Sequence, residues 1–290
     1  MTHLGNAVRR VRAANPSPLT GTGTNTYIVG TGAVAVIDPG PALPDHLDAI
    51  LAALTPGERI SHILVTHAHL DHSALAPAVQ AATGAQVLAF GDALSGRSAL
   101  MAQLLDRGMT GGGEGADASF RPDRTLADGD VVQGATWEIE AIHTPGHMGC
   151  HLAFGFGGVL FSGDHVMGWS STLVSPPDGD MGAYMASLSR LAARDWQVFL
   201  PGHGEPVADP AARLAELAAH RRAREAAILA ALKDRPATPM ALAQRIYTDT
   251  PAALLPAASR NVLAHLIDLV DRNEISATAF PGPAAHFHIP

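Results

Sequence analysis

The stretch VTHAHLDHSA, residues 65 to 74, decides the fold of this 290-residue chain. It follows the apolar run ISHIL at residues 60–64, which predicts a short buried strand. Neighbouring imidazoles repel one another when they are protonated, so crowding them needs a cause. A shared metal ion is such a cause, because a histidine that binds a metal is neutral. The stretch offers four ligands: His67, His69, Asp71 and His72. A hydrogen-bonded polar loop is the alternative, which so dense a cluster disfavours.

The sequence around this stretch alternates between strand and helix patterns. Two apolar runs separated by a Thr-Gly turn predict a β-hairpin over residues 25–40. Helical spacing over 44–54 and 73–84 flanks the strand predicted at 60–67, and a further strand follows at 85–90. Because helices that alternate with strands pack on the faces of a sheet, we expect an α/β fold.

The segment 91–124 interrupts this alternation. It begins with a helical pattern at 91–108 and continues with the glycine-rich sequence MTGGGEGADAS at 109–119. A segment of this kind is either a functional loop, such as a lid over a substrate, or a surface insertion that the fold tolerates. The sequence leaves both interpretations open.

The last third of the chain differs in character from the rest. Strand-like runs return at 136–166, followed by a helical pattern at 181–194 and a strand pattern at 196–201. From Asp209 onward the pattern is almost wholly helical and ends in a short apolar tail that predicts a hairpin or wing. We therefore predict two domains, residues 1–208 and residues 209–290.

The charge pattern disfavours a polyanionic partner. The formal net charge is −8 at pH 7, and residues 209–290, with nine Lys or Arg and eight Asp or Glu, are close to neutral. Proteins bind polyanions mainly through clustered Lys and Arg side chains. Arg221, Arg222 and Arg224 in the run HRRAREA could form such a cluster. The glutamates that flank them favour a solvated helix face instead.

Cysteine content and hydropathy indicate a compartment. Cys150 is the only cysteine, which excludes an intramolecular disulfide and fits a reducing environment. Residues 1–17 contain no apolar run long enough for a signal sequence. No run of ~18 apolar residues free of charge occurs, so we expect no membrane-spanning segment. We expect a cytoplasmic protein.

Three later residues extend the metal-binding pattern. His147 lies in HTPGHMGCH, Asp164 in FSGDHV and His203 in LPGHGEP. Each follows an apolar strand-like run and lies within or beside a glycine turn. Successive strands end at the same edge of a sheet, so we expect loops at one edge to bring these residues together with the first cluster.

The seven residues together suit two divalent ions. Neutral imidazole nitrogens and carboxylate oxygens are typical ligands of zinc. A carboxylate can also bridge two ions, because it has two oxygens. The expected sets are His67, His69 and His147 for the first ion, Asp71, His72 and His203 for the second, and Asp164 as the bridge.

These motifs resemble those of the metallo-beta-lactamase superfamily. HAHLDH matches the H-x-H-x-D-H signature, and Thr-Pro-Gly-His, Ser-Gly-Asp and Pro-Gly-His-Gly follow in the order of that family. The resemblance covers about residues 15–208. It implies a four-layer αβ/βα sandwich with two metal ions at one edge, usually zinc, with iron and manganese left open. It also implies that Asp38, in VIDPG, supports the metal-binding loop.

A finer resemblance concerns the second domain. The sequence from Gly163 to Leu191, followed by Pro-Gly-His-Gly and a helical C-terminal domain, is similar to the beta-lactamase-like protein 2 group. The resemblance implies a small, mostly helical, winged-helix-like domain at 209–290. Glyoxalase II enzymes share the metal motifs but have a different C-terminal domain. True β-lactamases usually carry a signal sequence and lack such a domain, so a β-lactamase is disfavoured.

The metal motifs predict hydrolysis but leave the cleaved bond open. Two ions would lower the pKa of water toward ~7 and so supply a metal-bound hydroxide, which Asp71 would help to orient. The first hypothesis is a hydrolase of small acyl substrates, with a thioester, lactone or other ester- or amide-type bond. The alternative is a phosphodiesterase acting as a single-strand endoribonuclease, with RNA as its partner. A non-enzymatic scaffold is least favoured, because structural zinc sites are normally closed and mononuclear.

Further side chains near the motifs are expected to assist. His143 and His151 are candidates for orienting metal ligands, because ligating imidazoles usually donate their second N–H to a partner. Cys150 is expected to be a buried apolar residue, since the ligand set is complete without it. Polar groups for the substrate are expected at Ser170, Ser171, Thr172, Asp178 and Tyr184. A homodimer stays open.

Overall fold

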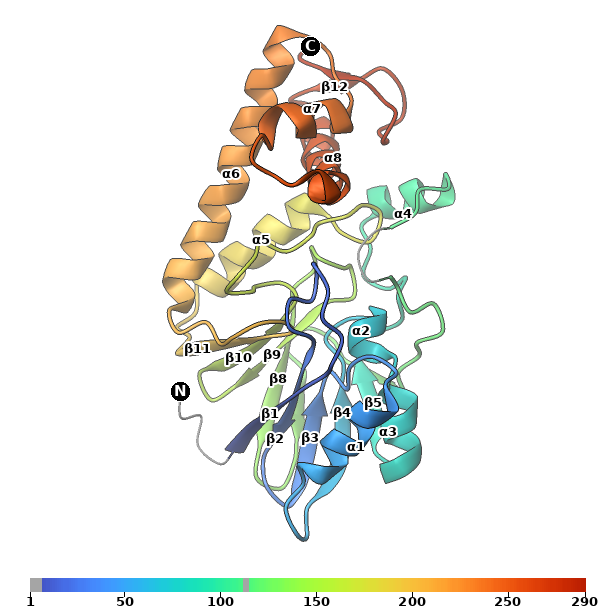
Figure 1. Cartoon of the computed structure of the whole chain (residues 1–290), viewed down its shortest axis with the longest axis vertical. Coiled ribbons are helices and arrows are strands. Elements are labelled where there is room, and N and C mark those ends of the chain that lie inside the picture. The colour runs from blue at the N-terminus through green and yellow to red at the C-terminus, as the bar shows by residue number, and fades with distance from the viewer. Residues whose placement is uncertain (1–6, 112–114) are drawn as a thin grey trace.

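The computed structural model describes residues 7–111 and 115–290. Residues 1–6 of the predicted first domain and residues 112–114 of the predicted glycine-rich loop lie outside the described residues. Figure 1 shows two sheets with helices on their outer sides, and a helical region beyond one end of the sheets. The predicted α/β class is confirmed.

The first sheet has six strands in the order β1-β2-β3-β4-β5-β6. The strands β1 to β3 pair antiparallel, whereas β3 to β6 pair parallel. Their bounds are β1 Val8–Arg12, β2 Asn25–Val29, β3 Ala33–Ile37, β4 Arg59–Leu64, β5 Gln86–Ala89 and β6 Arg124–Thr125. The sequence reading missed β1, because arginines interrupt its apolar residues. Charged side chains of this kind suit a strand at the edge of a sheet.

The second sheet has five strands in the order β11-β10-β9-β8-β7. The pair β10 and β11 is parallel, and the remaining pairs are antiparallel. Their bounds are β7 Val131–Gln133, β8 Glu138–His143, β9 Leu152–Phe156, β10 Val159–Gly163 and β11 Val198–Pro201. As a result β8, β10 and β11 run in the same direction and end at the same edge.

Helices cover the outer face of each sheet and complete four layers. The helices α1 (Pro44–Ala52) and α3 (Ala76–Thr83) bury Ile50 and Val79 against the first sheet. On the second sheet, α5 (Met181–Ala192) and the start of α6 (Pro210–Asp234) supply one apolar cluster with β8 to β11. A further cluster, from Tyr27 to Leu200, fills the space between the sheets. The predicted αβ/βα sandwich is therefore confirmed.

Two shorter helices belong to the loops of the first domain, α2 (Leu70–Ser73) and α4 (Ala99–Asp106). The sequence predicts a helix from residue 91, but α4 begins only at Ala99. The side chains of Asp92 and Ser95 instead close a turn, with a hydrogen bond of 2.9 Å. Ser98 then caps α4 by accepting from the amide of Met101.

The C-terminal region has an apolar core that also includes Met101 and Leu104 of α4. After the long α6 come α7 (Pro239–Ile246), the 3-10 turn η2 (Ala252–Leu254) and α8 (Leu255–Asp271). The predicted apolar hairpin forms from β12 (Ser276–Ala277) and β13 (Phe287–His288). Side chains of α6, α7, α8 and β13 pack around Leu266. The winged-helix-like architecture is confirmed, whereas the boundary at 208/209 stays a prediction; α6 begins at Pro210 and contacts both domains.

The segment Ala252–Asp271 is long and apolar enough, by length and composition, to cross a membrane. It has a mean hydropathy of 1.2, and 44% of it is buried within the molecule. It also contains Arg260, which donates to the Ser175 hydroxyl of the first domain across 2.8 Å. A core helix passes the same test of length and composition, so the expected absence of a membrane span stays a prediction.

Replacing Phe154 by Ala should lower the free energy of unfolding by about 3–5 kcal/mol, because it removes a fully buried ring between the two sheets and leaves a cavity. Denaturant unfolding measures this difference. Val131→Ala is the control, since Val131 is 42% exposed and its loss should cost little. Equal effects of the two substitutions would contradict the packing described for this core.

His265 predicts acid sensitivity of the C-terminal region. Its ring is buried and has no hydrogen-bond partner among the described residues. Burial, together with Arg221, lowers its pKa to about 3. The unfolded chain takes up this proton below about pH 6.5, so stability should fall as the pH drops from 6.5 toward 3. His265→Leu should remove about 2 kcal/mol of the loss between pH 7 and pH 5.

The measurement is denaturant unfolding at the two pH values with the metal content held constant. His286→Gln is the matched control, because His286 is exposed. If His265→Leu and the control show the same loss of stability on acidification, the buried His265 does not contribute to it.

Candidate metal centre

The seven predicted ligands lie together at one edge of the two sheets. His67 and His69 follow β4, and Asp71 and His72 lie in the short helix α2 that begins directly afterwards. The other three follow strands of the second sheet, each at its carboxyl end: His147 after β8, Asp164 after β10 and His203 after β11. Because these three strands are parallel to one another and end at the edge where β4 ends, residues as far apart as His67 and His203, 136 positions, lie in one cluster.

The first ligand group consists of three histidines. His69 Nδ1 lies 3.0 Å from His67 Nε2 and 3.0 Å from His147 Nε2. Two nitrogens bound tetrahedrally to one zinc ion at ~2.0–2.1 Å are roughly 3.3 Å apart, so this spacing is close to that of a common ligand sphere. The three atoms are one of the groups able to hold a metal ion.

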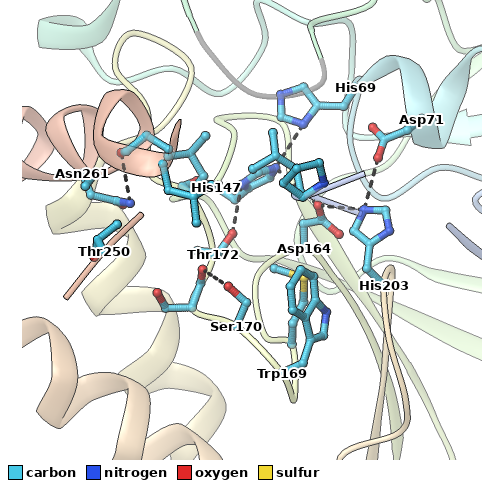
Figure 2. Close-up of a pocket in the computed structure, with 18 of the residues that line it drawn as sticks. His69, Asp71, His147, Asp164, Trp169, Ser170, Thr172, His203, Thr250 and Asn261 are labelled. Carbon is cyan, nitrogen blue, oxygen red and sulfur yellow. Dashed lines mark hydrogen bonds and ion pairs between the residues drawn. The ribbon is translucent and has the colours of Figure 1, made fainter. Parts of the chain in front are cut away.

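The second ligand group combines two histidines and a carboxylate. Asp71 Oδ2 lies 3.1 Å from His203 Nε2 and 3.5 Å from His72 Nε2, and the two nitrogens are 3.3 Å apart. Asp164 lies between the groups: Oδ1 is 3.4 Å from His72 Nε2, and Oδ2 is 3.3 Å from His203 and 3.8 Å from His147. Figure 2 shows Asp71, Asp164 and His203 turned toward one another.

Four of the five candidate histidine ligands have a partner for Nδ1, which leaves Nε2 free to bind metal. Asp38 Oδ2 lies 2.9 Å from His72 Nδ1 and accepts from the hydroxyl of Thr66, whose oxygen lies 2.9 Å from His67 Nδ1. The far nitrogens of the other two rings face backbone carbonyls, His147 that of Leu173 at 2.8 Å and His203 that of Gly23 at 3.3 Å. An Nδ1–H group bonded in this way fixes the tautomer, and the lone pair is then on Nε2.

The residues fit two divalent cations. Four buried atoms have no hydrogen-bond partner in the part of the chain that the structure describes: both oxygens of Asp71, Oδ1 of Asp164 and Nε2 of His69. Buried carboxylates without hydrogen bonds are costly unless they are paired or bind a cation. Imidazole and carboxylate ligands suit zinc, iron and manganese alike.

The two groups differ in their electrostatics. Burial lowers the pKa of His69 to about 3, with a further contribution from His147, and it lowers the pKa of His67 as well. In the second group burial opposes protonation, but the carboxylates of Asp164 and Asp71 outweigh it and raise the pKa of His203 to about 9. The first group is therefore a set of neutral ligands, and the second carries negative charge that favours a cation.

Backbone positions without side chains allow this density of ligands. A Cβ atom on Gly202 would lie 2.5 Å from Asp164 Oδ1 and 2.6 Å from His72 Cε1. Gly146, next to His147, has a φ of +145°, and a Cβ there would lie 2.4 Å from the Tyr184 Cα. Glycine is required at both positions, which explains the glycine turns around the motifs.

The predicted supporting residues divide into two kinds. Asp38 contacts the ligands directly, and it does so with a φ of +50°, a backbone conformation that is rare for residues other than glycine. His143 contacts none of the seven ligand side chains; its Nε2 lies 2.9 Å from the Gly149 carbonyl and its ring stacks on Phe90. His151 accepts instead from the amide of Asp164 at 3.2 Å. Cys150 is buried in the apolar core, and burial raises its pKa to about 11.

A pocket of about 300 Å³ opens beside the ligands. Figure 2 shows Trp169 and Ser170 on one side and Thr172, Thr250 and Asn261 on another. The described residues that line it include neither Lys nor Arg. Its wall away from the ligands is largely apolar and comes from both domains: Pro18, Leu19, Met167, Trp169, Leu173, Tyr247, Leu254, Ala257 and Ala258.

The predicted substrate residues are only partly at this pocket. Ser170, Ser171 and Thr172 line it, although the Thr172 hydroxyl is 3.0 Å from His147 Nδ1 and so supports that ligand. Asp178 does not line it, because it forms an ion pair with Arg97. Tyr184 does not line it either, since its side chain is fully buried in the apolar cluster beneath α5.

Sequence reasoning missed the apolar wall. Trp169, 47% exposed and five residues after Asp164, offered a signal, because a large exposed aromatic side chain often marks a binding surface. Tyr247, Leu254 and Asn261 offered none, since only the packing of the C-terminal region against the first domain brings them to the pocket.

Comparison with known proteins identifies two regions of the chain by family. Residues 19–203 match the metallo-beta-lactamase superfamily, and residues 238–279 match the beta-lactamase associated winged helix domain. The atrochrysone carboxyl ACP thioesterase of Aspergillus chevalieri is 34% identical over 233 residues, 78% of this chain and 66% of that protein. The match thus spans slightly less than two thirds of this fungal relative. The beta-lactamase-like protein 2 homolog of Drosophila melanogaster is 30% identical over 283 residues, 93% of this chain and 89% of that protein.

Two solved structures bear on the fold and on the metal. A metallo-beta-lactamase family protein from Thermus thermophilus is 25% identical with a TM-score of 0.76, covering 99% of this chain and 100% of that chain. The protein TTHA1623, solved in a di-iron-bound form, is 29% identical with a TM-score of 0.52, covering 69% of this chain and 94% of its own. The first likeness therefore extends over both domains.

Replacing Asp38 by Asn should weaken binding of the metal ion that His72 would hold about 10- to 100-fold, because an amide has only one acceptor oxygen. The carboxylate uses two: Oδ1 accepts from the Thr66 amide, and Oδ2 faces the His72 ring and the Thr66 hydroxyl. Competition with a chromophoric chelator measures the affinity. The exposed Asp48→Asn is the control for loss of one negative charge. Unchanged affinity in the Asp38 variant would remove its supporting role.

Proposed function

Because the chain belongs to the metallo-beta-lactamase superfamily, we propose that it is a dinuclear metal-dependent hydrolase of small acyl substrates, with thioesters as the favoured class. The observation that carries the proposal is the pair of ligand groups that share Asp164. Seven convergent ligands exceed what one tetrahedral ion uses, and two-metal hydrolases hold their ions ~3.5–4 Å apart. Zinc is the proposed metal, and the di-iron relative keeps iron as the alternative.

Two bound divalent cations would supply Lewis acidity, which lowers the pKa of water and polarises a carbonyl. The chain itself would supply proton transfer and orientation. Asp71 Oδ2 lies 3.1 Å from His203 Nε2 and would bind the second ion. We assign to the other oxygen, Oδ1, the proton of the attacking water. The Thr172 hydroxyl and the Leu173 carbonyl contact Nδ1 of His147, on the side of the ring away from Nε2. These contacts would keep the orientation of the ring constant during the reaction.

The pocket favours an acyl substrate over a polyanion. Apolar side chains such as Trp169 and Leu254 suit the hydrocarbon part of an acyl group, and Ser170, Ser171 and Asn261 offer hydrogen bonds to its polar atoms. Phosphodiesters, in contrast, are bound through Lys and Arg side chains, which the described lining residues lack. The fungal relative named as an acyl-carrier-protein thioesterase supports the same substrate class.

Single-strand RNA cleavage is the second candidate. It rests on the resemblance of the sequence motifs to the beta-lactamase-like protein 2 group and on the match of residues 238–279 to a beta-lactamase associated winged helix domain. We also propose a cytoplasmic location for the protein. The single buried thiol of Cys150 supports it, because proteins of reducing compartments rarely contain disulfides.

The test compares two substrate classes with the zinc-loaded protein. A panel of aliphatic and aromatic acyl thioesters should be hydrolysed, while a labelled single-stranded RNA should stay intact. Asp71→Ala should lower thioester kcat about 10²- to 10⁴-fold, because it removes the proposed proton acceptor. Trp169→Ala should act mainly by raising KM for aromatic acyl groups. The exposed Asp48→Asn serves as the control. RNA cleavage lost in the Asp71 variant, without thioester hydrolysis, would overturn the proposal in favour of the second candidate.

A further inference from the structure

Arg221 of α6 is a buried cation without an acidic partner. Its side chain is 1% exposed and is the largest of the fully buried side chains. Among the described residues no carboxylate oxygen lies within 4.0 Å of its guanidinium nitrogens, and the Nε atom has no hydrogen-bond partner. The sequence reading placed it on a solvated helix face, which is wrong for Arg221. Burying a charge without a counter-charge is costly, so its hydrogen bonds require an explanation.

Those hydrogen bonds reach the loop that leads from Asp164 to α5. The Nη2 of Arg221 donates to the backbone carbonyl of Thr172. Its Nη1 donates to Asn261 Oδ1 at 3.1 Å, and the same oxygen accepts from the amide of Val174 at 3.0 Å. The guanidinium also lies 5.2 Å from the ring centre of Tyr184, a distance at which an aromatic ring stabilises a cation.

The residue between these two contacts is Leu173, and it orients a metal ligand. Its carbonyl lies 2.8 Å from His147 Nδ1, while the Thr172 hydroxyl lies 3.0 Å from the same atom. Figure 2 shows Thr172 and Asn261 beside His147 on this side of the pocket. The peptide groups on both sides of Leu173 are thus held from the C-terminal region, by Arg221 of α6 and Asn261 of α8.

We propose that Arg221, acting with Asn261, is a positioning residue for the first metal ion. By fixing the carbonyl of Leu173, this pair holds His147 in the Nδ1–H tautomer and keeps its Nε2 directed toward His67 and His69. The C-terminal region therefore contributes to metal affinity as well as to the pocket wall. The inference rests on the proposed function only for the role of His147 as a ligand, and it is independent of the substrate.

The experiment is a metal titration of the full-length protein with Zn²⁺ against a chromophoric chelator. Arg221→Met keeps an unbranched apolar side chain but removes the guanidinium donors, and it should weaken binding of one of the two Zn²⁺ ions about tenfold while the other binds as before. Arg222→Met, the adjacent exposed residue of the same helix, is the matched control and should bind both ions normally. Unchanged binding of both ions by a folded Arg221→Met would overturn the proposal.

A second pair of variants separates positioning from general stability. Asn261→Ala removes the acceptor for Val174 and should weaken the same ion, whereas Asn261→Asp keeps the acceptor and should restore the affinity. Equal losses of affinity in both variants, or a fall in melting temperature without any change in Zn²⁺ affinity, would show that the contacts only stabilise the fold. If Arg221→Met does not fold, this pair alone decides. A failure of thioester hydrolysis in the unaltered protein would overturn the proposed substrate but not this inference.

Discussion

The convergence of imidazole nitrogens on shared positions is the interaction on which the rest of this structure depends. His69 Nδ1 lies 3.0 Å from two other ring nitrogens, an arrangement that lone pairs do not favour on their own. It becomes favourable when a cation accepts all of the lone pairs, and when the opposite ring nitrogens are held by acceptors. Asp38 supplies much of that support, and the strained backbone at this residue is consistent with a functional constraint.

The sandwich holds this cluster in place because strand ends are rigid positions. The ligands on β4, β8, β10 and β11 follow strands whose inward side chains form one continuous apolar core between the sheets. Glycine at 202 and 146 lets the backbone approach the ligands closely. The core therefore determines the ligand distances, and the loops only present the side chains.

The C-terminal region connects to this centre at two levels. It contributes Tyr247, Leu254 and Asn261 to the wall of the pocket, which makes the cavity a product of both domains. It also reaches the ligands through the loop around Leu173, by way of a buried guanidinium. Under the proposals made above, substrate selection and metal affinity would both depend on the same interface between the domains.

The α/β class, the helical second domain and the group of residues that converge could all be predicted from the amino-acid sequence. The ligands follow apolar runs, and the three later ones also lie within or beside glycine turns. These local patterns predict strand ends, whichever distant residues the strands contact. The edge strand β1 was missed because its arginines hide the alternation of Val8 and Val11. His143 was assigned to the wrong neighbours, because nearness in sequence to a ligand does not establish contact with it.

Only the tertiary structure decided which atoms and which distant residues complete the site. Asp178 and Tyr184 looked suitable for substrate binding by residue type, but an ion pair with Arg97 and burial beneath α5 remove them from the pocket. Arg221 looked exposed because its sequence neighbours are charged, yet it contacts Thr172, 49 residues away. Contacts of this kind depend on how two domains pack. No local periodicity records that packing, because it arises from the shapes of surfaces assembled from distant segments.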